Sequence, residues 1–309
     1  MSSNSAQQLR MVELIKSLAP TEGYTESMLD GVTFMRSDQA VPNTPALYEP
    51  SIVIVVQGRK RGFHGGRMYV YDARHYLVLA VPLPFSIETE ASAAEPLLGL
   101  ILRIDSAMVA ELAMEIDETL LQRPLNPVSL NATPIDDKLE SATLRLLEAL
   151  SSPLECKLLA PAIVREITYR VLTGEQGDGL RAALVQGSNF GRIARVLRRI
   201  HDQFDHNLDV GTLAQEASMS VPTFHTHFKA VTLTSPLQYI KTIRLHQARL
   251  MMIRNGISAV AASQQVGYES TSQFSREFKR LFGRSPKDET RHLKTLLSLS
   301  EPVTADTIK

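Results

Sequence analysis

The alternation of apolar and polar positions separates a strand-rich N-terminal part of the chain from a helical C-terminal part. From about residue 31 to residue 105, short aliphatic runs such as "SIVIVVQG" (51–58) and "LLGLILRID" (97–105) are separated by turn residues. Short runs at regular spacing predict a small β-barrel or sandwich, and His64-Gly65-Gly66-Arg67 predicts a hairpin turn within it. Over 105–173, and again beyond 189, apolar residues recur at helical spacing. The expected fold class is therefore α+β: an N-terminal β-barrel or sandwich followed by helices, and then an all-α domain.

The last third of the chain contains an internal repeat. Upstream in each copy, Leu213-Ala214 matches Val260-Ala261 at an offset of 47, which predicts a turn three residues longer in the second copy. Such self-similarity determines the architecture before any local prediction is made. Further along, Phe224, Phe228, Lys229 and Ser235-Pro236 recur 50 residues later as Phe274, Phe278, Lys279 and Ser285-Pro286.

Each copy is expected to form a helix-turn-helix. The phenylalanines at i,i+4 spacing place one face of the second helix in the core. A single copy would equally fit a helical hairpin that only packs. Two copies, at 209–230 and 258–282 and joined by a long helix over 236–254, favour a second helix that enters the major groove of DNA. The expected helix N-caps are Asp209, Ser220, Ser258 and Ser270.

The polar face of each second helix supplies the candidate DNA contacts. Gln273 and Arg276 carry the groups that read adenine and guanine, and His225 and Thr226 are the base-reading candidates of the first copy. Ser220, Thr223, Ser270 and Thr271 are expected to contact phosphates. The full set is Ser220, Thr223, His225, Thr226 and Lys229 in the first copy, and Ser270, Thr271, Ser272, Gln273, Arg276 and Arg280 in the second.

The charge distribution agrees with a nucleic-acid-binding C-terminal part. The whole chain has no net charge. Residues 1–187 hold 16 Lys and Arg against 23 Asp and Glu, a net charge of −7, whereas residues 188–309 hold 17 against 10, a net charge of +7. A basic half attracts the phosphate backbone without sequence information. Because this imbalance coincides with the helix-turn-helix pair, it favours double-stranded DNA as a partner.

The stretch "VAASQQVGYESTSQFSREFKRLFGRSP" (260–286) resembles the tandem helix-turn-helix domain of AraC/XylS-type transcription regulators. The sequence departs from that family at Thr226, where members often have arginine, and at 287–291, where members often have a Tyr-Arg pair. The resemblance implies a sequence-specific regulator. As in other members of that family, it implies activation of transcription through contact with RNA polymerase. It implies a DNA-binding domain at 189–295, after a glycine-containing linker at 174–188 and before a polar tail at 296–309.

The N-terminal part is similar to the cupin-like sensor region of the same family, through "QGRK" (57–60) and "YVYDARHYLVLAVPLP" (69–84). That resemblance implies a domain at 1–180 that binds a small-molecule effector of unknown identity and forms a homodimer through the helices over 105–173. Packing of those helices on the barrel of the same chain is the alternative. The aromatic effector candidates equally fit a barrel core. The cations near the turns, Arg59, Lys60 and Arg67, equally fit solvated positions. The effector candidates are Arg59, Phe63, Tyr69, Tyr71, Tyr76 and Phe85.

A single cysteine, Cys156, excludes an intramolecular disulfide and fits the reducing cytoplasm. It is a candidate sensor thiol, although a lone cysteine equally fits apolar packing. No apolar run approaches the ~20 residues that a membrane span requires, and the N-terminus has no apolar signal region. A cytoplasmic protein without a membrane partner is therefore expected.

Enzymatic motifs are absent from the sequence. The barrel region has two histidines, His64 and His75, whereas metal sites normally use three or four ligands. There is no nucleophile elbow, phosphate-binding loop or dinucleotide-binding turn. We therefore predict no catalytic residue, no metal and no cofactor. The alternatives are a cupin-type small-molecule or metal-dependent enzyme with a helical appendage, and a nucleoid-type protein that binds DNA without sequence preference.

Overall fold

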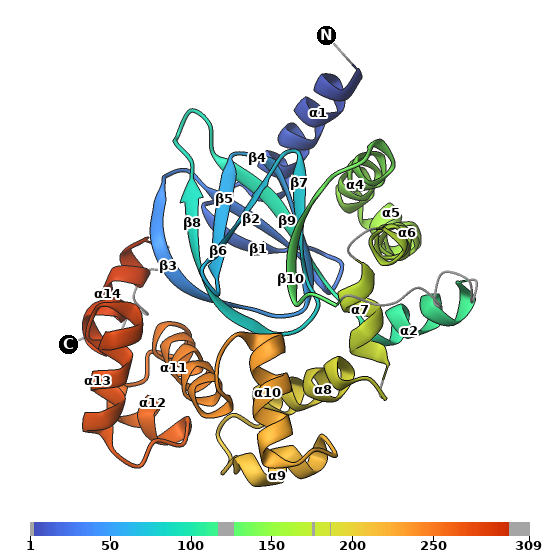
Figure 1. Ribbon diagram of the computed structural model, residues 1–309. Coiled ribbons are helices and arrows are strands. Elements are labelled where there is room, and N and C mark those ends of the chain that lie inside the picture. Colours follow the sequence, from blue (N-terminus) through green and yellow to red (C-terminus); the bar gives the residue numbers. More distant parts are fainter. Residues whose placement is uncertain (1–2, 117–126, 175–176, 186, 297–309) are drawn as a thin grey trace, which may run out of the picture.

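The computed structural model describes residues 3–116, 127–174, 177–185 and 187–296. Figure 1 shows a curved sheet at the centre, with helices α4 to α7 along one side and helices α8 to α14 against one end. The strand order is β1-β2-β9-β4-β7-β6-β5-β8-β3, and β10 pairs with β7. A cupin-like antiparallel half-barrel thus precedes the helices, as the sequence predicted. The strands are β1 (Gly23–Glu26), β2 (Val32–Ser37), β3 (Val41–Tyr48), β4 (Ser51–Gln57), β5 (Arg59–His64), β6 (Arg67–Asp72), β7 (His75–Leu79), β8 (Leu83–Glu90), β9 (Leu97–Arg103) and β10 (Leu130–Pro134).

Two of these strands lie outside the predicted barrel range. β1 precedes residue 31, and β10 lies within 105–173, where only helices were expected. The prediction was wrong at β10 because "LNATP" is short and largely polar, and its strand conformation depends on pairing with β7, more than 50 residues earlier in the chain. The residues of β10 alone do not indicate that a distant strand pairs with them. The predicted hairpin turn is confirmed, with Gly65 and Gly66 both at positive φ.

Helices cover the outer faces of the barrel. An N-terminal helix, α1 (Ser3–Leu18), buries Met11, Val12 and Ile15 against β4 and β9. This cover explains why residues 51–56 of β4 are all buried, on both faces of the strand. The helices after the barrel are α2 (Ser106–Glu115), α4 (Asp137–Leu150), α5 (Pro153–Leu158), α6 (Ala160–Thr173) and α7 (Gly177–Leu184).

Helix α7 corrects the predicted linker at 174–188. Its Leu180, Arg181 and Ala182 are buried, and Arg181 donates to the Leu172 carbonyl oxygen. A side chain at Gly179 would clash with the carbonyl oxygen of Val128. The glycine therefore permits close packing of a helix here, where the glycine content of the sequence had predicted a linker.

The C-terminal part confirms the predicted helix-turn-helix pair. The four phenylalanines of the repeat are fully buried, and α11 has the predicted bounds of the connecting helix. Side chains of Asp209, Ser220, Ser258 and Ser270 cap their helices as expected. The helices are α8 (Asn189–Asp202), α9 (Val210–Glu216), α10 (Val221–Thr232), α11 (Pro236–Arg254), α12 (Ala259–Gln265), α13 (Thr271–Phe282) and α14 (Pro286–Leu296). Residues 297–309 of the predicted tail lie outside the described residues.

The structure corrects the alignment of the two copies. α9 and α12 begin 49 residues apart, and α10 and α13 begin 50 residues apart. The turn of the second copy is therefore one residue longer, and the predicted three is wrong. The offset of 47 was misleading because Val260, although apolar, is 53% exposed, while Ala262 and Ser263 occupy the buried face.

Candidate nucleic-acid interface and ligand sites

The first candidate recognition helix, α10, presents its predicted DNA contacts to solvent. Ser220 caps the helix by accepting a hydrogen bond from Thr223 N at 3.4 Å, and its Oγ lies 2.8 Å from Thr223 Oγ1. Thr226 Oγ1 donates to the Pro222 carbonyl oxygen at 3.1 Å, which leaves its oxygen free to accept. Phosphate contacts at this N-terminus would also benefit from the helix dipole. All five predicted contacts of this copy are exposed: Ser220, Thr223, His225, Thr226 and Lys229.

The second candidate recognition helix, α13, is exposed in the same way. Ser270 caps it by accepting from Gln273 N at 3.3 Å. Thr271 differs from the other candidates because it is half-buried, with its Oγ1 3.4 Å from Ser263 Oγ. The exposed candidates are Ser270, Ser272, Gln273, Arg276 and Arg280. Both predicted base readers of this copy therefore lie on an accessible helix face.

A polar network that the sequence analysis missed holds Gln273. Its Nε2 donates to Glu277 Oε1 at 3.1 Å, and Glu277 also accepts from Lys241 Nζ and from Tyr268 OH, each at 2.8 Å. Partial burial raises the pKa of Glu277, but these three hydrogen bonds hold it below its ordinary value, so the carboxylate stays ionised. The i,i+4 spacing of Gln273 and Glu277 was the available signal. The network limits the rotamers of a base-reading side chain before DNA binds.

The arginines of α8 lie beside the first unit. Arg192 Nη1 donates to the Ser218 carbonyl oxygen at 3.4 Å, Arg195 Nη2 donates to the Glu216 carbonyl oxygen at 3.3 Å, and Arg199 pairs with the Glu216 carboxylate. These bonds fasten α8 to α9. A cavity of about 450 Å³ lies among Arg195, Arg198, Arg199, Asp202, Gln203 and Glu216.

The aromatic effector candidates line or border the barrel core. Tyr71, Tyr76 and Phe85 are buried, whereas Phe63 and Tyr69 are half-buried and Arg59 is exposed. Phe85 packs edge-on against Tyr48 with 5.0 Å between ring centroids. Tyr71 is fully buried, and its hydroxyl has no hydrogen bond of good geometry among the described residues. Burial, with a contribution from neighbouring Tyr48, holds the pKa of Tyr71 well above its ordinary value, so this orphan group is a neutral phenol.

Lys60 contradicts the expectation that cations near the barrel turns are solvated. It is only 4% exposed, and it faces Tyr71 directly across the β5–β6 pair. Its Nζ lies 3.3 Å from Tyr48 OH, and no ion pair to it occurs in the part of the chain that the structure describes. Burial lowers the pKa of Lys60, but the phenol oxygens of Tyr24 and Tyr48 raise it above the ordinary value. Among the described residues, the barrel therefore encloses a cation without a carboxylate partner, and a buried unpaired charge costs stability unless another group compensates it.

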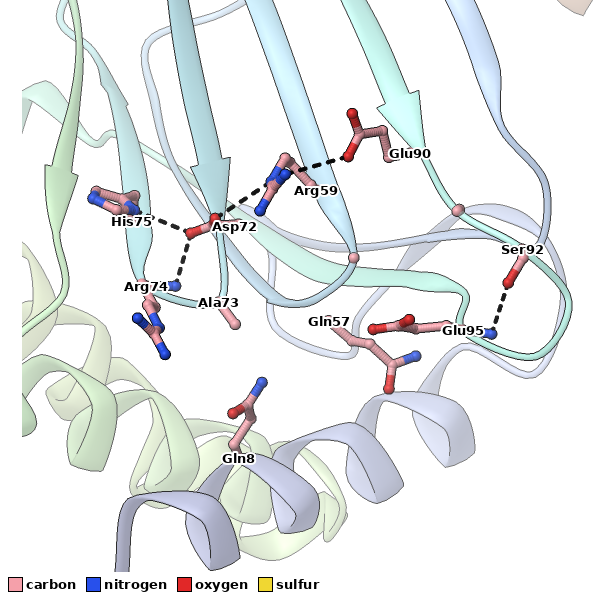
Figure 2. A pocket seen from close by; sticks show the side chains of 12 residues that line it. Gln8, Gln57, Arg59, Asp72, Ala73, Arg74, His75, Glu90, Ser92 and Glu95 are labelled. Carbon is pink, nitrogen blue, oxygen red and sulfur yellow. Dashed lines mark hydrogen bonds and ion pairs between the residues drawn. The ribbon is translucent and has the colours of Figure 1, made fainter. Parts of the chain in front are cut away.

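A polar cavity of about 780 Å³ lies at the end of the barrel where the turns after β4, β6 and β8 meet α1. Figure 2 shows Asp72 at its wall, accepting from His75 Nδ1 at 3.0 Å and paired with Arg59 at 3.6 Å. Partial burial raises the pKa of Asp72, but hydrogen bonds from His75 and the Arg74 backbone lower it overall. Among the effector candidates, Arg59 lines this cavity. The other wall residues with polar side chains are Gln8, Gln57, Arg74, Glu90, Ser92 and Glu95.

Two family comparisons cover both parts of the chain. Residues 28–179 match the family described as AraC-type transcriptional regulator N-terminus, and residues 213–292 match the family described as Helix-turn-helix domain. The chain belongs to the AraC/XylS family of transcription regulators. The first match spans strands β2 to β10 and helices α2 to α6, and the second spans most of the repeat.

Curated members of the AraC/XylS family are similar over a limited stretch. The RCS-specific HTH-type transcriptional activator RclR of Escherichia coli (strain K12) is 31% identical over 105 residues, which are 34% of this chain and 37% of RclR. The HTH-type transcriptional activator RhaS of Enterobacter sp. (strain 638) is 28% identical over 110 residues, which are 35% of this chain and 40% of RhaS. The match thus spans about two fifths of the length of these relatives.

Among solved structures, the fold is similar to that of ToxT from Vibrio cholerae. The crystal structure of unsaturated fatty acid bound wild-type ToxT from strain SCE256 has a TM-score of 0.62 at 14% identity, and the match covers 91% of this chain and 100% of ToxT. ToxT from strain O395 has a TM-score of 0.56 at 11% identity, with coverages of 86% and 99%. At such identities the likeness establishes the fold: a half-barrel with an attached helix-turn-helix pair.

Cys156 and the metal-ligating residue types have the following surroundings in the described residues. Cys156 is 4% exposed in α5, so a reagent would have to open that helix to reach the thiol. Within the described ranges, no group of three or more His, Cys, Asp and Glu is arranged to hold a metal ion. Likewise, no helix in those ranges has the length and apolar character needed to cross a membrane.

Proposed function

We propose that this chain is a sequence-specific regulator of transcription that places α10 and α13 in two successive major grooves on one side of a DNA duplex. The observation that supports this proposal is the tandem pair of capped helices, each with a buried phenylalanine face and an exposed polar face. Successive grooves on one side of a duplex lie ~34 Å apart. Gln273 and Arg276 are the proposed base readers of the second half-site, and Lys229 is a proposed phosphate contact of the first.

The test is selection of duplexes from a random-sequence library by the full chain, followed by affinity measurements at one fixed salt concentration. A sequence-specific regulator is expected to bind the selected duplex at least about 10³-fold more tightly than a scrambled duplex. A ratio near one would instead support a nucleoid-type protein without sequence preference.

Activation, through contact with RNA polymerase, is the proposed direction of regulation. RclR and RhaS are both named as activators, which supports this choice. A promoter carrying the selected duplex upstream of a reporter gene should become more active when the chain is expressed. A fall in reporter output would identify a repressor.

We propose that the half-barrel binds an effector with an anionic group near Lys60. The supporting observation is the buried ammonium of Lys60, which has no carboxylate partner among the described residues, beside the unpaired hydroxyl of Tyr71. The fatty acid bound to ToxT, which has the same fold, is a carboxylate and suggests the chemical class to try first. Tyr24, on the edge strand β1, lies near Lys60 and is 56% exposed, so it could move aside as a ligand enters.

Thermal-shift measurements with saturated and unsaturated fatty acids, aromatic acids and their neutral amides test this proposal. A ligand that binds only the folded chain raises the unfolding midpoint, by about 2.7 kcal/mol at a hundred times its dissociation constant. The shift should require the carboxylate and should disappear in Lys60→Met. Loss of the shift in Glu95→Gln, with Lys60→Met unaffected, would place the ligand in the cavity of Figure 2 instead.

The homodimer is proposed to form through α5 and α6. Leu154, Leu158 and Leu159 are between 50% and 66% exposed, and Tyr169 of α6 is 44% exposed. Apolar side chains gathered on one exposed region mark interaction surfaces. Sedimentation should show a dimer for the native chain and a monomer for the double variant Leu154→Glu/Leu158→Glu. The same sedimentation coefficient for the variant as for the native chain would rule out this surface.

The proposed action is binding and not catalysis, supported by membership of a family of regulators. The competing idea is a cupin-type enzyme with a helical appendage. A stoichiometric metal in the purified chain, together with turnover of a small substrate, would favour that idea.

A further inference from the structure

The end of α10 is the part of the first helix-turn-helix unit that lies against the barrel. Leu233, directly after the helix, packs so closely on Gly65 in the β5–β6 turn that a Cβ at Gly65 would clash with Leu233 Cδ1. Beside this contact, Ser129 Oγ donates to the Val231 carbonyl oxygen at 2.6 Å. The barrel therefore touches the last turn of the first candidate recognition helix.

Neighbouring helices are fastened to the same end of the barrel. Tyr239 OH in α11 donates to the Pro82 carbonyl oxygen at 2.7 Å, and burial keeps the pKa of Tyr239 well above its ordinary value, so the phenol retains that proton. His201 in α8 contacts both α11 and the barrel: its Nε2 lies 2.9 Å from Tyr239 OH, and its Nδ1 lies 3.0 Å from Glu49 Oε1. Three barrel turns, after β3, β5 and β7, thus contact the first unit and its supporting helices.

The second unit is not held in this way. α13 lies against β3, but among the described residues no hydrogen bond or ion pair joins α12 or α13 to the barrel. Arg249, on the connecting helix α11, donates to the Pro45 carbonyl oxygen at 2.9 Å. The described polar contacts between barrel and C-terminal part therefore concentrate on the first unit and α11.

The backbone at Leu233 is unusual for a leucine. Its φ of 58° and ψ of 13° lie in the left-handed region, which side chains with a Cβ disfavour. The corresponding residue 50 positions later is Gly283, at φ 78°, and a Cβ added there would have no described atom within 4 Å. Glycine is the usual residue at this helix cap. The first unit thus has a residue in this disfavoured conformation at a cap that contacts the barrel, and such strain persists only where surrounding contacts compensate it.

We propose that Leu233 couples the barrel to the first helix-turn-helix unit, because docking on Gly65 holds the left-handed cap at the end of α10. This inference rests on the proposed function, since it describes how the barrel would regulate DNA binding. In the docked state Leu233 N–H donates to the Lys229 carbonyl oxygen at 2.8 Å. Undocking frees Leu233 to leave the left-handed region, which opens that hydrogen bond and loosens the turn that carries Lys229. A displacement of the β5–β6 turn therefore reaches DNA through the first half-site.

Hydrogen exchange on the full chain, without DNA or effector, tests the docking itself. Gly65→Ala removes the space that Leu233 occupies and is expected to raise amide exchange at Leu233 about fivefold or more, while exchange at Gly283 stays unchanged. Gly66→Ala is the matched control, since Gly66 is in the same turn at φ 76° but has open space around it. Equal effects of the two substitutions, or no effect of Gly65→Ala, would overturn the proposal.

Affinity for the selected duplex, with one or the other half-site scrambled, tests the coupling. Gly65→Ala is expected to weaken binding about fivefold when the first half-site is intact and to have no effect when that half-site is scrambled. Leu233→Gly retains the cap without the strain, so adding Gly65→Ala to it should change nothing further. Additive effects of the two substitutions would refute direct coupling. If no duplex is selected at all, the proposed function fails, while the exchange experiment still decides whether Leu233 docks.

Discussion

The two helix-turn-helix units share their helices, caps and phenylalanine faces, but they differ at the left-handed positions of the backbone. The second unit has Gly267 and Gly283 at these positions, both at φ 78°, which is what local sterics favour. The first unit has Ser218 at φ 54° and Leu233 at φ 58°. Both exceptions contact other elements, Ser218 through Arg192 of α8 and Leu233 through the barrel. Gly267 likewise accepts a hydrogen bond, from Arg244 Nη1 of α11 at 3.0 Å, so the contrast between the units lies at the caps: Leu233 contacts the barrel, whereas a Cβ at Gly283 would meet no described atom within 4 Å.

The hydrophobic cores of the two units also differ in whether they are continuous with the core of the barrel. Phe224 and Phe228 belong to the main hydrophobic cluster, which extends through α8 into the barrel. Phe274, Phe278 and Phe282 belong to a separate cluster with residues of α11 and α12. A contiguous cluster unfolds as a unit, whereas a satellite cluster can open alone. The first unit is expected to share the stability of the barrel, and the second to have its own.

The largest effect should come from deleting a phenylalanine in each unit. Phe278→Ala is expected to cost about 3–5 kcal/mol and to melt the second unit ahead of the rest, because its cluster is separate. Phe228→Ala makes a similar cavity in the main cluster and should lower the midpoint of the main transition. Calorimetry distinguishes the two; one transition shifted equally by both substitutions would contradict the separate-cluster interpretation.

The next effect concerns DNA recognition by the two units. Arg276→Ala in α13 is expected to lose about 1–3 kcal/mol on the selected duplex and to relax specificity at one base pair of the second half-site. Lys229→Ala in α10 should weaken binding to all duplexes alike and reduce the salt dependence. Fluorescence anisotropy on selected and scrambled duplexes checks both. Equal losses of Arg276→Ala on the two duplexes would rule out its base-reading role.

Exchanging the cap residues tests the contrast between Leu233 and Gly283. Gly283→Leu should destabilise the chain by about 1–2 kcal/mol, because it introduces left-handed strain where no barrel contact compensates it. Leu233→Gly should change stability by less, since relief of strain offsets the lost docking. Urea unfolding of the full chain measures both. A larger loss for Leu233→Gly than for Gly283→Leu would show that docking far outweighs the strain.

The smallest effect at neutral pH, which grows on acidification, concerns His246. This histidine is 2% exposed and packs on Phe282 of the second unit, with 5.1 Å between ring centroids. Burial lowers its pKa well below the ordinary value, and the charges of Arg249 and His201 add to this. As the pH falls below about 6.5, the unfolded chain takes up a proton that the native chain does not, so stability falls. Urea midpoints at several pH values should show this decline in the native chain, and a flatter dependence in His246→Gln. An equally steep decline in the variant would assign it to other groups.

Features encoded by neighbouring residues were predictable from the sequence. The i,i+4 phenylalanines and the serine and aspartate caps act within one or two helical turns, so their pattern survives in any tertiary context. The exposed sides of α10 and α13 followed from the same periodicity, which is why the DNA-contact candidates lie where they were expected, apart from half-buried Thr271. The exposed Val260 misled the alignment because an apolar residue need not be buried.

The ligand chemistry of the barrel was less accessible. Arg59 and Lys60 are adjacent cations near a turn, and alternation along β5 places one in solvent and the other inside. Which of the two faces inward depends on the register of β5 with β6 and β8, and the residues of β5 alone do not determine that register.

The sequence by itself determined two helix-turn-helix units, their polar faces, the charge difference between the two halves and a strand-rich N-terminal part, because short-range periodicity and composition specify each of these. Only the tertiary structure decided that Lys60 is a buried cation, that the glycines around Gly179 pack a helix, and that Leu233 is the cap that meets the barrel. These features depend on contacts between residues that are far apart in the chain, such as Leu233 and Gly65, and such contacts form only when the chain folds.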